Sequence, residues 1–247
     1  MWTDLVMEIR IDSLYRGAQD ARGTVVIIDV FRAFTTAAVA FSKGADRIVL
    51  VAEVEDALKL REQGVGEICM GEVDGIRPEG FDLGNSPYEI LDADVAGKTL
   101  IQSTRAGTVG MSAAVNASQI YAGSLVIAEA TVRAILRDAP ELVTIVAMGA
   151  EARVHADEDE QCALYMRNLL QGRKPEHNAV RELVLAGAEA QKYADPEQPQ
   201  FHPEDRDMAL QIDSVDFAIK VGREDGLLVA RRFDIDSTLN DDTEGSR

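Results

Sequence analysis

The sequence predicts an α/β fold in which a largely parallel or mixed sheet is flanked by helices. Three observations support this prediction. Apolar runs rich in Val and Ile recur between residues 25 and 148, helical patterns lie between them, and the chain then changes to helices followed by a hairpin pattern. Continuous Val and Ile runs are typical of strands buried on both faces, and strands that alternate with helices are typical of parallel sheets.

Six apolar runs are expected to form the strands of this sheet. They cover residues 25–30, 47–51, 67–72, 98–104, 119–124 and 142–148. Segments with an apolar stripe at helical spacing lie between them, and we expect helices at about 33–43, 53–63, 107–117 and 125–138. This alternation predicts βαβ units around a common sheet.

The C-terminal part is predicted to close the fold. Three helical segments, at 158–172, 177–194 and 203–212, precede two strands within 217–233 that join at Glu224-Asp225-Gly226. We expect these helices and the hairpin to complete a second lobe of one α/β unit over residues 1–233, with a cleft between the lobes. The segment 194–205 holds three of the seven prolines and is predicted to be a linker or lid. The acidic residues 234–247 are predicted to form a disordered tail.

The charge balance limits the classes of partner. The chain has 25 Lys and Arg against 43 Asp and Glu, a formal net charge of −18. Such a surface repels a phosphate backbone over a Debye length of about 8 Å at physiological salt, which argues against nucleic acid. A small anionic ligand stays compatible with this charge if arginines, backbone N–H groups or a divalent cation meet it locally.

Cysteine usage and the N-terminal sequence favour a soluble cytoplasmic protein. Cys69 and Cys162 are far apart with no CxxC pair, which argues against a disulfide framework or a zinc cluster. The first residues lack the basic head and apolar run of a signal peptide, and no segment approaches membrane-spanning length. We therefore expect no membrane partner. The oligomeric state is left open, with a homodimer as one candidate.

Polar residues follow most of the apolar runs, at the positions where open α/β sheets bind ligands. They include Asp29, Arg32, Glu72, Ser103, Thr104, Arg105, Ser124 and Glu151. Because the carboxyl ends of parallel strands share one edge of a sheet, we expect these side chains to converge if the sheet is parallel.

Two of these positions allow both a structural and a functional interpretation. Asp29 either caps the next helix and pairs with Arg32, or it is a metal ligand or nucleophile whose neighbour Arg32 clamps a phosphate or sulfonate. The turn at 103–108, STRAGT, is either an ordinary connection or an anion cradle built from N–H groups at the start of a helix.

The acidic run at 157–160 is open in the same way. Acids at the start of a helix favour its positive end and need no further explanation. Alternatively, Glu158 or Asp159 faces the cleft and joins Asp29 and Glu72 as oxygen ligands of Mg²⁺, which prefers carboxylates and water.

Several familiar sites are excluded by their missing motifs. The chain has no GxGxxG after a strand, no GxxxxGK[ST] and no GxSxG, so dinucleotide-binding, P-loop and α/β-hydrolase sites lack their loops. The three histidines show no metal-ligand spacing, and we assign none of them a role.

Taken in order, several strings resemble the 2-phosphosulfolactate phosphatase family. They are VVIIDVFRAFTT, GADRIVLVAEVEDAL, GEVDGIRPEGFDLGNSP, TRAGT, YAGS and EDEQCA, which together span roughly residues 25 to 170. The resemblance implies a Mg²⁺-dependent phosphatase with an α/β fold. Its substrate would be a small anionic phosphoester like 2-phospho-3-sulfolactate, cleaved to the hydroxy acid and phosphate, a reaction of coenzyme M synthesis.

The resemblance also implies roles for individual residues. Catalytic roles fall on Asp29, Arg32 and Glu72, substrate contacts on Asp82, Asn85, Ser86, Thr104, Gly107 and Thr108, and metal ligation on Asp29, Glu72, Glu158 and Asp159. Arg105 is a further expected substrate contact, from its place in the STRAGT turn rather than from the resemblance. Within GFDLGNSP at 80–87, Ser86 is expected to cap a helix with Pro87 at its first position, while Asn85 faces substrate. Asp82 either orients a ligand or braces the loop.

Two departures from the family pattern motivate alternatives. Val73 stands where the family often has an arginine, and Arg105-Ala106 replaces an asparagine-glycine pair. An altered substrate is one consequence, and a non-catalytic binder of a phosphorylated or sulfonated metabolite is the alternative function. A purely structural α/β protein is the third hypothesis, but it leaves the polar residues after the strands unexplained.

Overall fold

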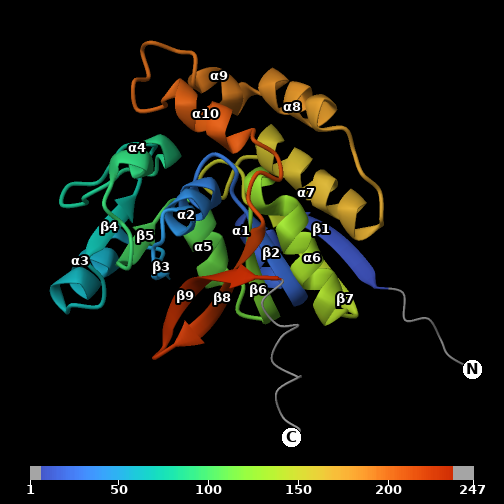
Figure 1. Cartoon of the computed structure of the whole chain (residues 1–247), viewed down its shortest axis with the longest axis horizontal. Helices are drawn as coiled ribbons and strands as arrows, with labels where there is room; N and C mark the ends of the chain where they lie inside the picture. Colours follow the sequence, from blue (N-terminus) through green and yellow to red (C-terminus); the bar gives the residue numbers. More distant parts are fainter. Residues whose placement is uncertain (1–6, 236–247) are drawn as a thin grey trace, which may run out of the picture.

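One mixed sheet of nine strands runs through the computed structural model, which describes residues 7–235 (Figure 1). The strands are β1 (Glu8–Ser13), β2 (Gly23–Ile28), β3 (Arg47–Val51), β4 (Ile68–Gly71), β5 (Thr99–Ser103), β6 (Ala117–Gly123), β7 (Leu142–Ala147), β8 (Phe217–Glu224) and β9 (Leu227–Asp234). Their order in the sheet is β1-β7-β2-β6-β8-β9-β3-β5-β4. The predicted α/β class is therefore confirmed, in its mixed-sheet form.

Helices connect most of the strands, as the alternating pattern predicts. They are α1 (Leu14–Asp20), α2 (Ala33–Ser42), α3 (Val54–Glu62), α4 (Pro87–Asp92), α5 (Gly107–Ala113), α6 (Ala128–Asp138), α7 (Asp157–Leu170), α8 (His177–Ala186), α9 (Ala188–Lys192) and α10 (Pro203–Ala209). All six strands expected before residue 150 are confirmed, with bounds shifted by no more than two residues. The helix expected at 107–117 ends at Ala113, because β6 already begins at Ala117.

The first strand and helix, β1 and α1, are additions to the expected set. β1 lies at one edge of the sheet and alternates exposed with partly buried residues. Its charged residues Glu8, Arg10 and Asp12 separate the apolar Ile9 and Ile11, so the strand has no continuous apolar run. Its sequence therefore does not show the continuous apolar run that is typical of a strand buried on both faces.

The C-terminal hairpin lies in the middle of the sheet. β8 pairs antiparallel with β6, and β9 pairs antiparallel with β3. The sequence predicts the hairpin and its turn, but not this position between two sets of parallel strands. Three successive antiparallel pairings also reverse the chain direction between the two sets, so the carboxyl ends of the two sets do not share one parallel edge.

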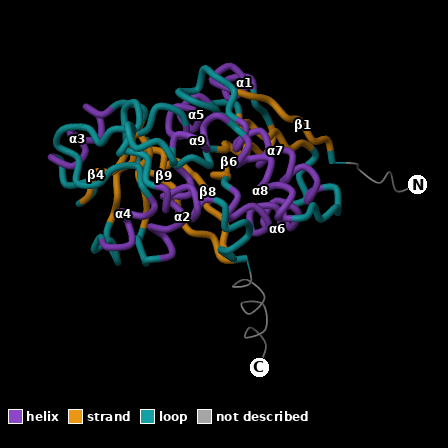
Figure 2. The backbone as a smooth tube through the Cα atoms, turned by 90° about the horizontal axis from the view of Figure 1, so that it is seen from above, coloured by secondary structure: helices purple, strands orange, loops and turns teal. Residues whose placement is uncertain are grey.

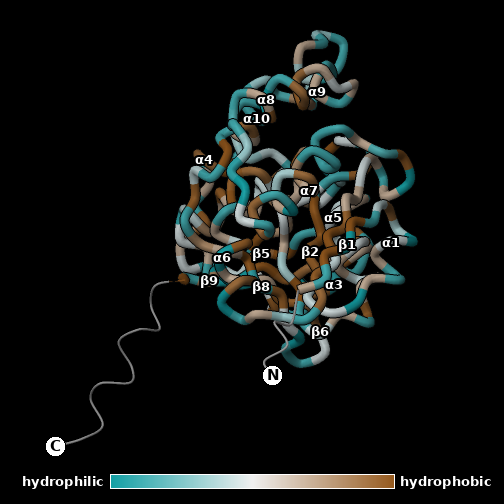
Figure 3. Tube along the Cα trace, turned by 90° about the vertical axis from the view of Figure 1, so that its right-hand side faces the viewer, coloured by the Kyte–Doolittle hydropathy of each residue, from teal (hydrophilic) through white to brown (hydrophobic). Residues whose placement is uncertain are grey.

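Both faces of the sheet are buried, as the apolar runs predict. In β2, Val25 and Ile27 pack into the cluster that includes α2 and α5, whereas Val26 and Ile28 pack into the cluster of α6 and α7. Helices accordingly lie on both sides of the strands (Figure 2). The hydrophobic segments concentrate along the strands (Figure 3).

Helices α8, α9 and α10 gather at one end of the molecule, beyond the strands (Figures 1 and 3). The proline-rich segment predicted as a linker or lid connects α9 to α10. The tail predicted at 234–247 lies outside the described residues, except for Asp234 and Ile235. Within residues 7–235, no helix has the length and apolar character needed to cross a bilayer.

Candidate active site

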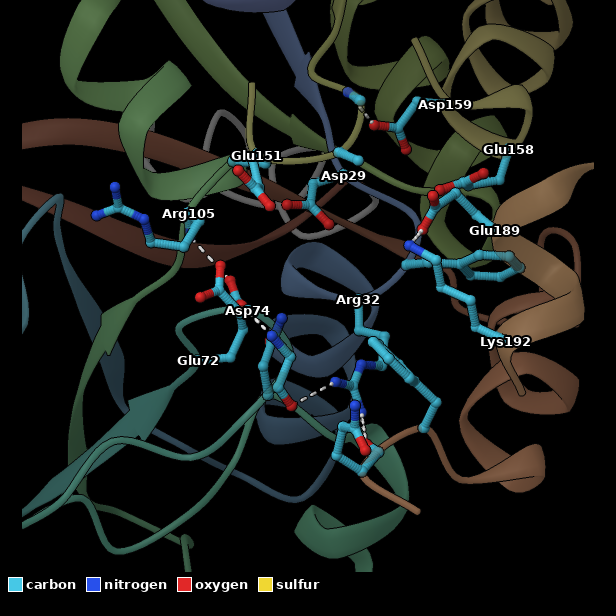
Figure 4. Close-up of a pocket in the computed structure, with 18 of the residues that line it drawn as sticks. Asp29, Arg32, Glu72, Asp74, Arg105, Glu151, Glu158, Asp159, Glu189 and Lys192 are labelled. Carbon is cyan, nitrogen blue, oxygen red and sulfur yellow. Dashed lines mark hydrogen bonds and ion pairs between the residues drawn. The ribbon is translucent and has the colours of Figure 1, made fainter. Parts of the chain in front are cut away.

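A pocket rich in carboxylates lies where the loops after β2, β4, β5 and β7 meet α7, α9 and the segment before α10 (Figure 4). Its volume is about 220 Å³. Among the described residues that line it are seven acids and three bases: Asp29, Glu72, Asp74, Glu151, Glu158, Asp159, Glu189, Arg32, Arg105 and Lys192. The structure therefore brings together the four carboxylates that the family resemblance assigns to a metal.

Asp29 is fixed by two backbone N–H groups from different helices. It is buried directly after β2, and its Oδ1 accepts a hydrogen bond from the N–H of Ala33 at 2.9 Å. Its Oδ2 accepts one from the N–H of Gly107 at 2.8 Å. The capping interpretation is therefore correct for the contact with α2. Each oxygen keeps a further lone pair, so the contact does not exclude a role as ligand.

The turn after β5 holds Glu72 as well as Asp29. Glu72 Oε1 accepts a hydrogen bond from the N–H of Arg105, and its Oε2 accepts one from the N–H of Gly75, both at 2.8 Å. A side chain at Gly107 would place its Cβ 2.9 Å from Asp29 Oδ2, closer than such contacts allow. The predicted anion cradle is thus corrected in one respect: the anions that these N–H groups bind are the protein's own carboxylates.

Burial and mutual repulsion raise the pKa values of the carboxylic acids in this cluster. Burial raises the pKa of Asp29 to about 6, and the charge of Glu72 adds to it, although the N–H groups of Ala33 and Gly107 act in the opposite direction. Burial raises the pKa of Glu158 to about 8, with further increases from Glu189 and Asp29. When these acids are ionised, the cluster carries a high density of negative charge, which a bound cation would neutralise.

Asp159 is the most constrained member of the cluster. Its Oδ1 accepts a hydrogen bond from the N–H of Val30 and its Oδ2 one from the N–H of Gly149, both at 2.8 Å. Burial, followed by the charges of Glu158 and Asp29, raises its pKa well above the ordinary value. Asp159 consequently ties the loop after β2 to the loop after β7.

Arg32 has a different partner from the one that the sequence suggests. Its Nη1 lies 2.7 Å from Asp205 Oδ2, and both side chains are buried. The same nitrogen donates to the carbonyl oxygen of Gln200 at 3.1 Å, and Nη2 donates to that of Gly75 at 3.4 Å. The expected ion pair with Asp29 is therefore corrected to one with Asp205. The role of Arg32 as an anion clamp stays a prediction.

The other two pocket bases are differently placed. The guanidinium of Arg105 lies 3.8 Å from Glu53 and points away from Asp29 (Figure 4). Lys192, on α9, has its Nζ 2.6 Å from Glu189 Oε2 on the wall of the pocket. Sequence reasoning missed Lys192 and Glu189, because they belong to a short helix with no recognisable motif.

The 80–87 segment forms part of the pocket wall, as expected. Asn85 lines the pocket and is 5% exposed, and its Oδ1 has no hydrogen-bond partner among the described residues. Ser86 caps α4 by accepting from the N–H of Glu89, with Pro87 at the first helical position, as predicted. Ser86 Oγ also donates to Asp205 at 2.6 Å.

Three residues predicted to contact substrate have hydrogen-bond partners within the protein. Asp82 accepts a hydrogen bond from the N–H of Cys69 at 2.8 Å and pairs with Arg61 at 2.9 Å, so it braces the loop. The Thr104 N–H and the Thr108 hydroxyl bond to each other at 2.8 Å, inside the turn before α5. None of the three lines the pocket, and their contact with substrate stays a prediction.

Fold and pocket together define an α/β protein with a carboxylate-rich ligand site beyond the ends of its strands. The 2-phosphosulpholactate phosphatase family matches residues 11–208. The chain belongs to this family, as the motifs predict.

Curated relatives support this assignment, and each bears the name probable 2-phosphosulfolactate phosphatase. The protein from Bacillus subtilis (strain 168) is 31% identical over 204 residues, 81% of this chain and 87% of the relative. The protein from Thermus thermophilus is 36% identical over 62% of this chain and 64% of its own length. The one from Carboxydothermus hydrogenoformans is 39% identical over 52% and 55%.

Proposed function

We propose that this chain hydrolyses a small phosphate monoester of a 2-hydroxy acid, of the 2-phospho-3-sulfolactate type, to the hydroxy acid and phosphate. The names of its relatives support the reaction class. The observation that carries the proposal is the pair Asp29 and Glu72, which the turn after β5 holds through N–H groups only two residues apart. Carboxylates held in fixed positions suit a site that stabilises the charge of the transition state without moving during the reaction.

We further propose that the site uses Mg²⁺. The oxygen-rich lining suits this ion, and burial, with a smaller effect of neighbouring acids, raises the pKa values of Asp29 and Glu158. The described residues contain no group of three acids, histidines or cysteines placed to hold a metal. Mg²⁺ commonly binds through one or two carboxylates together with waters and substrate phosphate, and Asp29 and Glu72 fit that mode. When bound, the ion would neutralise charge on the phosphoryl group.

The remaining pocket side chains would bind and orient the ester. Asn85 offers its amide at the pocket wall, and the hydrogen-bonding capacity left open at its Oδ1 fits a polar partner. Attack by water and attack by Asp29 are two routes to the same products. The configuration at phosphorus, followed with an ester whose phosphate is chiral by oxygen isotopes, separates them, because one displacement by water inverts it and two displacements through phospho-Asp29 retain it.

Lys192→Gln is expected to raise KM about tenfold for esters that carry a second anionic group, with a smaller effect on kcat. A charge-assisted hydrogen bond contributes about 1.5–3 kcal/mol, and about 1.4 kcal/mol corresponds to a tenfold change. Lys192 can exchange its contact with Glu189 for a sulfonate or carboxylate of the substrate. Phospholactate and phosphosulfolactate should show the effect, whereas a phosphate ester without a second anion should not. An equal rise in KM for both classes would contradict this role.

A screen for phosphate release with Mg²⁺ tests the proposed function. Phosphosulfolactate, phospholactate and phosphoglycolate are suitable esters, and the unfolding temperature is measured with each. The competing function is a non-catalytic binder, and it is favoured by the departures from the family pattern at Val73 and Arg105-Ala106. A binder would be stabilised by an ester but would release no phosphate.

We also propose a cytoplasmic location, which two free, buried cysteines support. The homodimer and the lack of nucleic-acid binding remain predictions from the sequence. Size measurement in solution tests the first of them.

A further inference from the structure

Asp205, on α10, connects three segments that surround the pocket, although it does not line the pocket itself. The residue is fully buried. Its Oδ2 lies 2.7 Å from Arg32 Nη1, and its Oδ1 accepts hydrogen bonds from the Ser86 hydroxyl at 2.6 Å and the N–H of Tyr88 at 3.0 Å. One carboxylate therefore holds the loop after β2 and the start of α4 against α10.

The partners of Asp205 in turn fix two walls of the pocket. Through Arg32, Asp205 orients a guanidinium whose other hydrogen bonds go to the carbonyl oxygens of Gln200 and Gly75, two pocket-lining residues from different segments. The same guanidinium lies over the ring of Phe201, 5.2 Å from its centroid. The loop after β4 and the segment before α10 are thus held together at Arg32.

Through Ser86, Asp205 also sets the position of Asn85. Asn85 directly precedes the helix cap and lines the pocket, and its buried Oδ1 has no hydrogen-bond partner among the described residues. A change in the first turn of α4 would therefore move the amide relative to Asp29 and Glu72. A displacement of about 1 Å is enough to cost up to a hundredfold in rate or binding at an organised site.

The chemistry of these contacts requires a carboxylate. Asp205 accepts three hydrogen bonds and donates none, and it faces the buried positive charge of Arg32. An asparagine has only one acceptor oxygen, and its NH₂ would face a donor. Loss of one partner of a buried ion pair leaves the other charge without compensation.

We propose that Asp205 is a positioning residue for substrate binding, which sets the Asn85 amide and joins the two walls of the pocket through Arg32. This inference rests on the proposed function, because the site it positions is the phosphoester site. It assigns the geometry of the pocket to a contact network anchored outside it.

The test compares Asp205→Asn with Asp213→Asn, a matched variant away from the pocket. Asp213 is also largely buried and accepts hydrogen bonds from the N–H of Glu129, at a helix start, and from the Tyr165 hydroxyl. Both variants should lower the unfolding temperature. Only Asp205→Asn should raise KM, by about tenfold or more, with a smaller change in kcat. A KM within about twofold of wild type in folded Asp205→Asn would overturn the proposal, as would an equal rise in Asp213→Asn.

A milder variant keeps the proposal testable if Asp205→Asn does not fold. Ser86→Ala retains the ion pair and removes a single contact, and it should raise KM less than Asp205→Asn. In an Asn85→Ala background, the effect of Ser86→Ala on KM should vanish, because both act through the same amide. Additive effects would argue against positioning.

Binding of orthophosphate with Mg²⁺, measured by calorimetry, separates failure of this inference from failure of the proposed function. A wild-type protein that binds orthophosphate but releases none from any ester would fail the hydrolytic proposal alone. The proposal for Asp205 would then be tested by the dissociation constant of orthophosphate, measured for the same variants and for the wild type. Unchanged orthophosphate binding in both Asp205→Asn and Ser86→Ala would overturn it.

Discussion

Asp29→Asn is expected to lower the rate of phosphate release by several orders of magnitude while the protein keeps its fold. The substitution conserves size, but it removes the negative charge proposed to hold Mg²⁺ against the phosphoryl group. The new amide can accept from only one of the N–H groups of Ala33 and Gly107, and its NH₂ faces the other. Relief of a buried charge beside Glu72 partly offsets the lost hydrogen bond in stability.

The measurement is phosphate release at saturating Mg²⁺, with unfolding temperature as the control for folding. Asp138→Asn is the matched variant, since Asp138 lies at the end of α6, where it accepts from the Tyr121 hydroxyl at 3.3 Å. It should leave turnover near wild type. Turnover of folded Asp29→Asn within about tenfold of wild type would contradict the assignment, because loss of an essential charged group costs far more.

The order of apolar and polar residues along the chain was enough to predict the individual strands and the hairpin turn. The run Val25–Ile28 predicts a strand with both faces covered, and its alternate residues do pack into two different clusters. The hairpin turn at 224–226 is also local and was predictable. The insertion of β8 and β9 between β6 and β3 was not, because pairing partners nearly 100 residues or more apart leave no trace in the hydrophobic period.

In the site, too, some residues could be predicted from the sequence and others only from the tertiary structure. Asp29 and Glu72 could be singled out because each directly follows a buried strand, where ligands bind in α/β folds. Their convergence on one turn could be expected only in outline, and the N–H groups of that turn proved to bind carboxylates rather than substrate. Asp205 resembles an ordinary acid at a helix start. Its partner Arg32 is 173 positions away in the chain, so only the tertiary structure reveals the pair.

Removal of divalent metal is expected to abolish phosphate release and to make stability strongly pH-dependent. In the metal-free protein, the folded-state pKa values of Asp29, Glu158 and Asp159 are raised above those of the unfolded chain. The folded state then binds more protons than the unfolded state between these values. Its free energy of unfolding therefore falls as pH rises from about 4, through about 6 for Asp29 and about 8 for Glu158.

Mg²⁺ should reverse most of this loss, because it binds the deprotonated carboxylates and only the folded chain assembles them. The rise in unfolding temperature on adding Mg²⁺ should accordingly be much larger near pH 8 than near pH 5. Glu158→Gln serves as the matched variant: it removes the group whose pKa is about 8, so metal-free stability should decline less between pH 6 and pH 8 than in the wild type, and the decline that is left there is due to Asp159. An equal effect of Mg²⁺ at both pH values, or an equal effect of NaCl at matched ionic strength, would show that the ion acts by screening alone and that the pocket carboxylates do not bind it.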